Sequence, residues 1–197
     1  MTLCLVLCAC STLPLAPIGD TNFVANQQAL EAQRVWALQG RLNLRQGSQS
    51  DTVNIRWQQQ DENFDIVLRG ALGIGNTRVH GGNQGLLLEK SGEKPVSLAN
   101  LEALTQDYLG FEFPAGYLSH WVRGLPVPEI PAIPSFDDNS RLVALVQEDK
   151  LGRRWQLGFD QYKEVGKLIL PGRIRLEQPD FKLTFIISDW QLGAASP

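Results

Sequence analysis

The chain has 197 residues, of which 43% are hydrophobic and 20% are charged, as in an ordinary globular domain. This composition excludes global disorder, and a net charge of −3 argues against a nucleic-acid partner, which would require a basic surface. The length fits one domain with a substantial core, and we expect it to act as a monomer.

The first ten residues, MTLCLVLCAC, contain all three cysteines of the chain. Their apolar stretch has the length of a signal-peptide core and is too short to span a bilayer. It ends at Leu7-Cys8-Ala9-Cys10, which resembles the lipobox of bacterial lipoproteins and implies cleavage before Cys10 and acylation of that residue. A signal peptide begins with positive charge, but the first cation here is Arg34, so we expect the leader to be incomplete. The alternative is an apolar terminus with incidental cysteines.

The residues after Cys10 predict a tether and a location. Lipoprotein sorting retains proteins with Asp after the cysteine in the inner membrane, whereas Ser11 implies the outer membrane. Pro14, Pro17 and Gly19 follow without an apolar period, which is typical of a linker. The predicted organisation is a signal peptide over 1–9, a lipidated tether over 10–21 and a single domain over 22–197.

The domain is predicted to begin with a short helix and to continue mainly as strands. Asn22 is the expected cap, and Phe23, Gln27, Leu30 and Arg34 follow at helical spacing. The chain then switches to a period of two, typical of antiparallel strands with one apolar face. The apolar positions are Trp36, Leu38, Gly40, Leu42, Leu44, Val53, Ile55, Trp57, Phe64, Ile66, Leu68, Leu86, Leu88, Trp155, Leu157, Phe159, Ile174, Leu176, Phe181, Leu183, Phe185 and Ile187. A further strand is expected over 76–80, and turn residues at 46–48, 61–63, 81–83 and 91–92 predict hairpins.

The middle of the chain predicts two short helices. The segment 97–109 has apolar residues at helical spacing and ends at Gly110, an expected C-cap. The segment 114–122 opens with Pro114 in a first-turn position. The segment 126–138 contains four prolines and is predicted to be an ordered loop without regular structure.

A long antiparallel sheet of this kind curls towards a barrel, and the two helices would cover its apolar interior. Such an interior is either a packed core or a ligand cavity. Periodicity does not separate these alternatives, and a packed core is the commoner outcome.

The chain offers little for catalysis or metal binding. His80 and His120 are about forty residues apart, and no cluster of metal-ligating residues surrounds either. Ser119 and His120 are adjacent on a predicted helix, so their side chains are expected to diverge rather than form a nucleophile pair. The glycine-rich segment 70–75 lacks the spacing and following helix of a dinucleotide site. We therefore predict no catalytic residue, no metal, no cofactor and no enzymatic activity.

Leu72 and Ile74 are apolar residues flanked by glycines in a predicted turn. Turns are usually polar, so these side chains either contact another surface or fold inward. The residues alone leave both alternatives open.

Several short motifs occur in the order and spacing of one known family. They are Trp36-x-Leu-x-Gly-Arg-Leu, Trp57, Leu72-Gly73, Leu109-Gly110-Phe111-x-Phe113-Pro114, Leu118-x-x-Trp121-x-x-Gly124-x-Pro126, Leu170-Pro171 and Asp189-Trp190. With the lipobox, they make the chain resemble the outer-membrane lipoprotein receptor family LolB over most of its length.

The resemblance implies a mainly β fold, an unclosed antiparallel β-barrel with short α-helices as a lid over a hydrophobic cavity. It implies a receptor that accepts acylated lipoprotein cargo from the periplasmic carrier LolA and inserts it into the inner leaflet of the outer membrane. Leu72, Gly73 and Ile74 would form a loop that contacts outer-membrane phospholipids, although the family often has proline where Ala71 stands. The candidate acyl-chain cavity residues are Trp36, Leu38, Leu42, Ile55, Trp57, Ile66, Leu118 and Trp121.

Two other functions fit parts of the same pattern. A periplasmic lipid-binding carrier or envelope-assembly factor would share the fold but lack insertion activity, and the lipobox argues against it. An enzyme with an unfamiliar site would require buried polar residues around a pocket.

Overall fold

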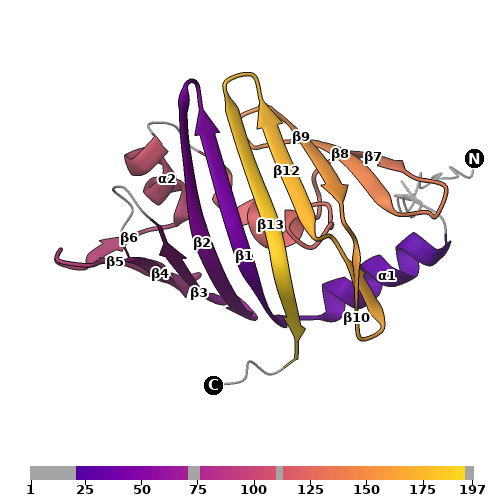
Figure 1. The fold of residues 1–197 in the computed structure, drawn as a ribbon, viewed down its shortest axis with the longest axis horizontal. Helices are drawn as coiled ribbons and strands as arrows, with labels where there is room; N and C mark the ends of the chain where they lie inside the picture. Colours follow the sequence, from indigo (N-terminus) through magenta and orange to yellow (C-terminus); the bar gives the residue numbers. More distant parts are fainter. Residues whose placement is uncertain (1–20, 71–75, 110–112, 194–197) are drawn as a thin grey trace, which may run out of the picture.

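The computed structural model describes residues 21–70, 76–109 and 113–193, which form one curved antiparallel sheet with short helices (Figure 1). The helices are α1 (Thr21–Ala32), α2 (Leu101–Leu109), the 3-10 helix η1 (Ala115–Tyr117) and α3 (Leu118–Trp121). The strands of the first half are β1 (Val35–Gln46), β2 (Gln49–Gln60), β3 (Asn63–Arg69), β4 (Asn76–Gly82), β5 (Gly85–Lys90) and β6 (Val96–Leu98). Those of the second half are β7 (Ala132–Phe136), β8 (Leu142–Glu148), β9 (Arg154–Asp160), β10 (Lys163–Val165), β11 (Leu168–Leu170), β12 (Arg173–Gln178) and β13 (Phe181–Leu192).

Eleven strands form the main sheet in the order β6-β5-β4-β3-β2-β1-β13-β12-β9-β8-β7, and β10 pairs with β11 as a separate hairpin. The first and last strands of the described chain are neighbours in the sheet, because β1 pairs with both β2 and β13. In the described part of the chain the sheet does not close, since β6 and β7 remain at opposite edges. The prediction of a mainly β, unclosed antiparallel barrel is therefore confirmed.

The alternation along β1 explains both faces of the sheet. Leu38 is buried at 1% exposure and faces the helices, whereas Arg41 is exposed on the outer face. Between them, Gly40 lies beside an irregularity in the pairing with β13. A Cβ atom at Gly40 would collide with the carbonyl oxygen of Ile186, so β1 and β13 approach this closely only with glycine at this position.

The second half of the sheet holds a densely packed core. Trp155, Ile174 and Leu176 are fully buried on its inner face, and α3 packs over them through Trp121. Trp121 lies 6.1 Å from the Trp155 ring, and the Phe113 ring meets Trp155 edge-on at 5.1 Å. This half is a packed interior, as most barrel interiors are.

Gln147 on β8 joins this core to the segment after α3. Its side chain is 1% exposed and accepts hydrogen bonds from Trp121 Nε1 and Val127 N, each at 2.9 Å. Its amide nitrogen donates to the carbonyl oxygens of Val127 and Ile130, each at 3.1 Å. One amide therefore satisfies four polar groups, of which the Trp121 indole N–H is buried and the backbone groups of Val127 and Ile130 are partly buried.

Replacing Gln147 with leucine should lower the free energy of unfolding by about 4 kcal/mol, because the buried Trp121 N–H and three partly buried backbone groups would lose their partner. Chemical denaturation monitored by tryptophan fluorescence measures the change. Gln156→Leu is the matched control, since Gln156 is exposed on the neighbouring strand β9. Equal effects of the two substitutions would contradict the role given to Gln147.

Helix α1 is fastened across the sheet edge by three kinds of contact. The Phe23 ring meets Phe136 at 4.7 Å, and Asn26 exchanges two hydrogen bonds with the backbone of Ile169. Arg123, 8% exposed, donates from Nη1 to the carbonyl oxygen of Leu30 at 2.8 Å and so caps the end of the helix. Burial lowers the pKa of Arg123 to about 10, so the guanidinium stays charged at neutral pH.

No helix in the described ranges is long and apolar enough to span a bilayer.

Two predicted elements differ from the structure. The helix expected over 97–109 begins only at Leu101, because Leu98 pairs with Leu86 in edge strand β6. The loop expected over 126–138 contains strand β7, in which Pro134 pairs with Leu145. Since β7 is an edge strand, the missing N–H of proline costs no hydrogen bond of the sheet.

The expected C-cap at Gly110 lies outside the described residues. The helix expected over 114–122 is present as η1 followed by α3, with Pro114 just before the first turn.

Candidate functional site

An apolar cavity of about 260 Å³ lies between the first half of the sheet and the helices. Its sheet wall includes Leu42, Leu44, Val53, Ile55, Trp57, Ile66, Leu68, Val79, Leu88, Leu183 and Phe185. Its helix wall includes Leu101, Leu104, Thr105, Phe113, Ala115 and Leu118. Figure 1 shows α2 over the inner face of this half of the sheet, so the helix forms a lid on the cavity.

The register of the strands produces the apolar wall. Trp57 pairs with Ile66, Ile66 with Val79, and Val79 with Leu88, so these four side chains form one row on the inner face. The period-two pattern of each strand thus becomes a continuous surface only after pairing. The row is covered by α2, whose Leu104 packs against the cluster of Val79 and Leu88.

The lid is tied to η1 through a few hydrogen bonds. Phe113 N donates to Thr105 Oγ1 at 3.1 Å, and Gly116 N donates to Glu102 Oε1 at 3.0 Å. The side chain of Asn100 caps the start of α2 by accepting from Ala103 N at 2.8 Å. Leu101 and Leu104 contact the wall through apolar side chains.

The cavity has a polar end. Thr77 and Lys90, which pair across β4 and β5, line it together with Asp51 on β2. These residues lie where β3 ends at Arg69 and β4 begins at Asn76, and Arg69 pairs with Asn76. The end of β3 and the start of β4 therefore lie at the polar end of the cavity.

Five of the eight predicted cavity residues line the cavity, namely Leu42, Ile55, Trp57, Ile66 and Leu118. The other three, Trp36, Leu38 and Trp121, are instead in the packed core at 2%, 1% and 0% exposure. The Trp36 ring lies between Trp57 at 5.1 Å and Trp190 at 5.9 Å, with the guanidinium of Arg123 at 5.5 Å from it. Helix α3 and Arg123 close the interior over these residues, and single-strand periodicity carries no information about that cover.

The helix wall was largely missed by sequence reasoning. Leu101 and Leu104 were visible as helical spacing, but nothing in the sequence indicates that they face the β2–β5 rows. Phe113 lies in the LGFEFP motif and contacts both the cavity and the core. Cys10, Leu72, Gly73 and Ile74 fall outside the described residues, and their roles stay predictions.

Ser119 and His120 are closer than predicted. Ser119 Oγ lies 3.4 Å from His120 Nδ1, so the expectation of diverging side chains is wrong. The hydroxyl also donates to the carbonyl oxygen of Gly116 at 3.3 Å. Burial and the nearby Arg123 lower the pKa of His120, and within the described ranges no carboxylate hydrogen-bonds to its ring. The pair lacks the orienting third group of a catalytic triad and does not line the cavity.

The arrangement is suited to holding an apolar ligand. The lining is almost entirely hydrocarbon, and the polar groups of Asp51, Thr77 and Lys90 are confined to one end. A long aliphatic chain would gain the free energy of leaving water without requiring a specific hydrogen-bond partner. In the described ranges, no group of three or more metal-ligating side chains comes together.

Comparison with known proteins gives a consistent result. The family model described as "LolB: Outer membrane lipoprotein LolB" matches residues 34–190. A relative from Cellvibrio japonicus named "Outer-membrane lipoprotein LolB" is 34% identical over 91% of this chain and 87% of its own length. One of the same name from Stutzerimonas stutzeri is 33% identical over 95% and 92%. The crystal structure of a LolA superfamily protein from Nitrosomonas europaea shares the fold, with a TM-score of 0.58 at 10% identity, over 91% of this chain and 96% of that one.

Proposed function

The chain belongs to the LolB family of outer-membrane lipoproteins and functions in lipoprotein localisation; we propose that it accepts acylated lipoproteins from a LolA-type periplasmic carrier and inserts them into the inner leaflet of the outer membrane. The observation that carries this proposal is the apolar cavity between the β1–β5 half of the sheet and the α2 lid. In this proposal the cavity holds the acyl chains of the cargo during transfer.

The physical chemistry of the cargo favours direct handover between two proteins. Each CH₂ group of an acyl chain gains about 0.8 kcal/mol on leaving water, so a lipoprotein does not cross the periplasm free in solution. A receptor that binds the chains only about 1.4 kcal/mol more tightly than the carrier shifts the distribution tenfold. The transfer then needs neither a nucleotide nor a covalent step, and we propose that the protein is not an enzyme and works as a monomer.

The polar end of the cavity is the proposed exit. The segment 71–75 connects β3 and β4 beside Thr77 and Lys90, which line that end. Its Leu72 is the residue that we propose touches the outer-membrane phospholipids, while acylated Cys10 holds the protein at the membrane. The cargo would then leave the cavity next to the lipid that receives it.

Replacing Leu104 with glutamate should reduce acceptance of acylated cargo about 100-fold or more, because a carboxylate in an apolar cavity costs several kcal/mol when it is desolvated. The measurement is the amount of acylated lipoprotein transferred from the purified carrier to this protein. Leu104 is half-buried and lines the cavity, and Gln106→Glu on the exposed side of the same helix is the matched control.

Thermal unfolding of both variants separates lost binding from lost structure. Since Leu104 is only partly buried, Leu104→Gln serves as a milder second variant, with an intermediate loss of acceptance. If Leu104→Glu folds and accepts cargo as well as the parent, the cavity is not the acyl-chain site.

A further inference from the structure

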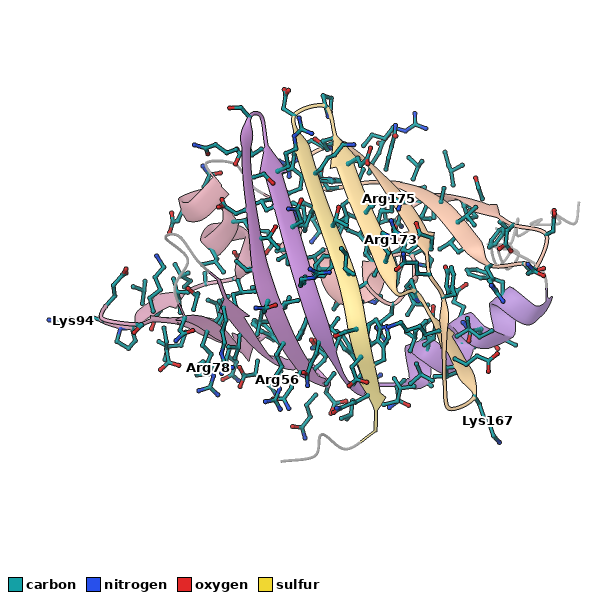
Figure 2. All side chains as sticks on the ribbon, in the orientation of Figure 1. Arg56, Arg78, Lys94, Lys167, Arg173 and Arg175 are labelled. Carbon is teal, nitrogen blue, oxygen red and sulfur yellow. The ribbon has the colours of Figure 1, made fainter. Side chains whose placement is uncertain are left out.

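The outer face of the sheet carries a group of arginines that the proposed function leaves unused. Arg41 on β1, Arg56 on β2 and Arg69 on β3 are exposed, and among the described residues none of them forms a salt bridge. Arg78 on β4 lies beside them, and Figure 2 shows Arg56 and Arg78 close to each other on the outer side of β2–β4. We call Arg41, Arg56, Arg69 and Arg78 the basic face.

The strand register sets the spacing of the basic face. Arg41 pairs with Asn54 and Asn54 with Arg69, so the two arginines are two strands, or about 10 Å, apart. Arg56 lies on the strand between them, two residues along from Asn54 and on the same face. Arginines spread over three neighbouring strands offer several positive charges to a surface that carries many anionic groups.

The charge balance of this region is opposite to that of the whole chain. The charged residues that line the groove over this face are Arg56, Arg69, Arg78 and Lys90 against Asp65 and Glu89, whereas the chain has a net charge of −3. Both carboxylates are engaged by Arg78, since its Nη2 lies 2.6 Å from Asp65 Oδ2 and its Nη1 lies 3.7 Å from Glu89 Oε2. The hydrogen bond from Arg78 holds the pKa of Asp65 below its usual value. Arg56 adds a weaker charge interaction with Asp65, whereas Arg41 and Arg69 pair with no carboxylate among the described residues.

The basic face also adjoins the polar end of the acyl-chain cavity. An open groove of about 560 Å³ runs over it and is lined by Arg56, Arg69 and Arg78. Thr77 and Lys90 line both this groove and the cavity. The arginines, the end of the cavity and the ends of β3 and β4 that carry the segment 71–75 therefore lie together.

We propose that the basic face binds the anionic headgroups of a phospholipid bilayer and so holds the polar end of the cavity against the membrane. The role of this contact in cargo delivery rests on the proposed function. The binding of headgroups does not, because it requires no cargo. A bilayer is favoured over an acidic protein because the arginines spread over neighbouring strands beside the end of an apolar cavity, where a bilayer offers an extended anionic surface. Basic residues near an anionic bilayer attract it over roughly one Debye length.

The test measures how the full chain binds to vesicles, using Cys10→Ala as the parent so that the acyl anchor does not contribute. Vesicles of pure phosphatidylcholine are compared with an equimolar mixture of phosphatidylcholine and phosphatidylglycerol by co-sedimentation. The parent should prefer the anionic vesicles and lose this preference as the salt concentration rises. The triple variant Arg41→Gln/Arg56→Gln/Arg69→Gln should bind the anionic vesicles about 100-fold more weakly, at about fivefold for each arginine.

The matched control removes the same charge elsewhere. Lys94→Gln/Lys150→Gln/Lys167→Gln changes three exposed lysines, and Figure 2 shows Lys94 and Lys167 at opposite ends of the molecule. This control should lose less than about threefold in affinity, because its three lysines lie in loops and not on the strands of the basic face. Replacing the three arginines with lysine should keep most of the binding, which shows that the side-chain charge and not altered folding is responsible.

Three results would overturn the proposal. The parent could bind both vesicle types equally, or the arginine and lysine triples could lose binding equally, which would show that net charge alone matters. The arginine triple could also keep vesicle binding but lose acceptance from the carrier, which would assign the face to an acidic protein surface. Failure of the proposed function looks different, because vesicle binding would then follow these expectations while cargo transfer did not occur.

Discussion

Changing Cys10 to alanine is expected to move the protein from the outer membrane to the soluble periplasmic fraction. The lipobox Leu7-Cys8-Ala9-Cys10 places acylation at Cys10, so the acyl chains on this residue are the proposed anchor. A single acyl chain gives only marginal, reversible membrane binding, whereas two or more give stable anchoring. Loss of all the chains at Cys10 should therefore change the distribution almost completely, and membrane fractionation with immunodetection measures it.

The leader provides its own control for this experiment. Cys8→Ala places alanine, the more usual small residue, two positions before Cys10, and it should leave the protein in the membrane. A Cys10→Ala protein that stays membrane-bound in high salt would contradict the anchor. If it stays bound only in low salt, the remaining attachment is electrostatic and is the expected contribution of the basic face.

Changing Leu72 to glutamate is expected to stop delivery of cargo to the outer membrane while acceptance from the carrier continues. One leucine that enters lipid gains roughly 1.5–3 kcal/mol, and a carboxylate in its place opposes entry. The strand register supports a local effect, because Arg69 and Asn76 pair on either side of the segment that contains Leu72, beside the polar end of the cavity. An assay with loaded carrier and outer-membrane vesicles separates the two steps, and cargo should accumulate on the receptor.

Gln84→Glu is the matched control for Leu72→Glu. Gln84 is exposed in the turn after β4, at the opposite end of that strand, so the same charge is added far from the proposed exit. The control should deliver cargo at the rate of the parent. Normal delivery by the Leu72→Glu protein would remove the role given to this segment, and lost acceptance would show that the substitution affects the cavity instead.

The strands that alternate strictly were predictable from the sequence, whereas β7 and β8, which do not, were missed. β1, β2, β3, β9, β12 and β13 each have one apolar and one polar face, because their outer side chains meet water. β8 carries apolar residues on both faces, with Val143 exposed between Leu142 and Ala144, and so shows no such pattern. β7 contains a proline that only its edge position tolerates. Residue patterns within one strand do not show which strand will lie at an edge.

The sequence does not predict which inward-facing residues form the packed core and which line the cavity. Trp36 and Trp57 occupy equivalent inward positions on neighbouring strands, yet Trp36 is in the packed core and Trp57 lines the cavity. The difference comes from what covers them, since Arg123 lies over the Trp36 ring. The Arg123 guanidinium is held in this position by hydrogen bonds to the backbone carbonyl oxygens of Leu30 and Ser119. The residue that covers Trp36 therefore comes from a distant part of the chain.

The sequence by itself determined the lipobox at Cys10, the apolar face of the strands and the motifs that identify the family, because each depends on residues close together in the chain. Only the tertiary structure decided that α2 covers the first half of the sheet and leaves a cavity there, while α3 and α1 close the second half. It also decided that Arg41, Arg56 and Arg69 share one outer face beside the end of that cavity. These features depend on strand register and on helix placement, which arise from contacts between distant segments.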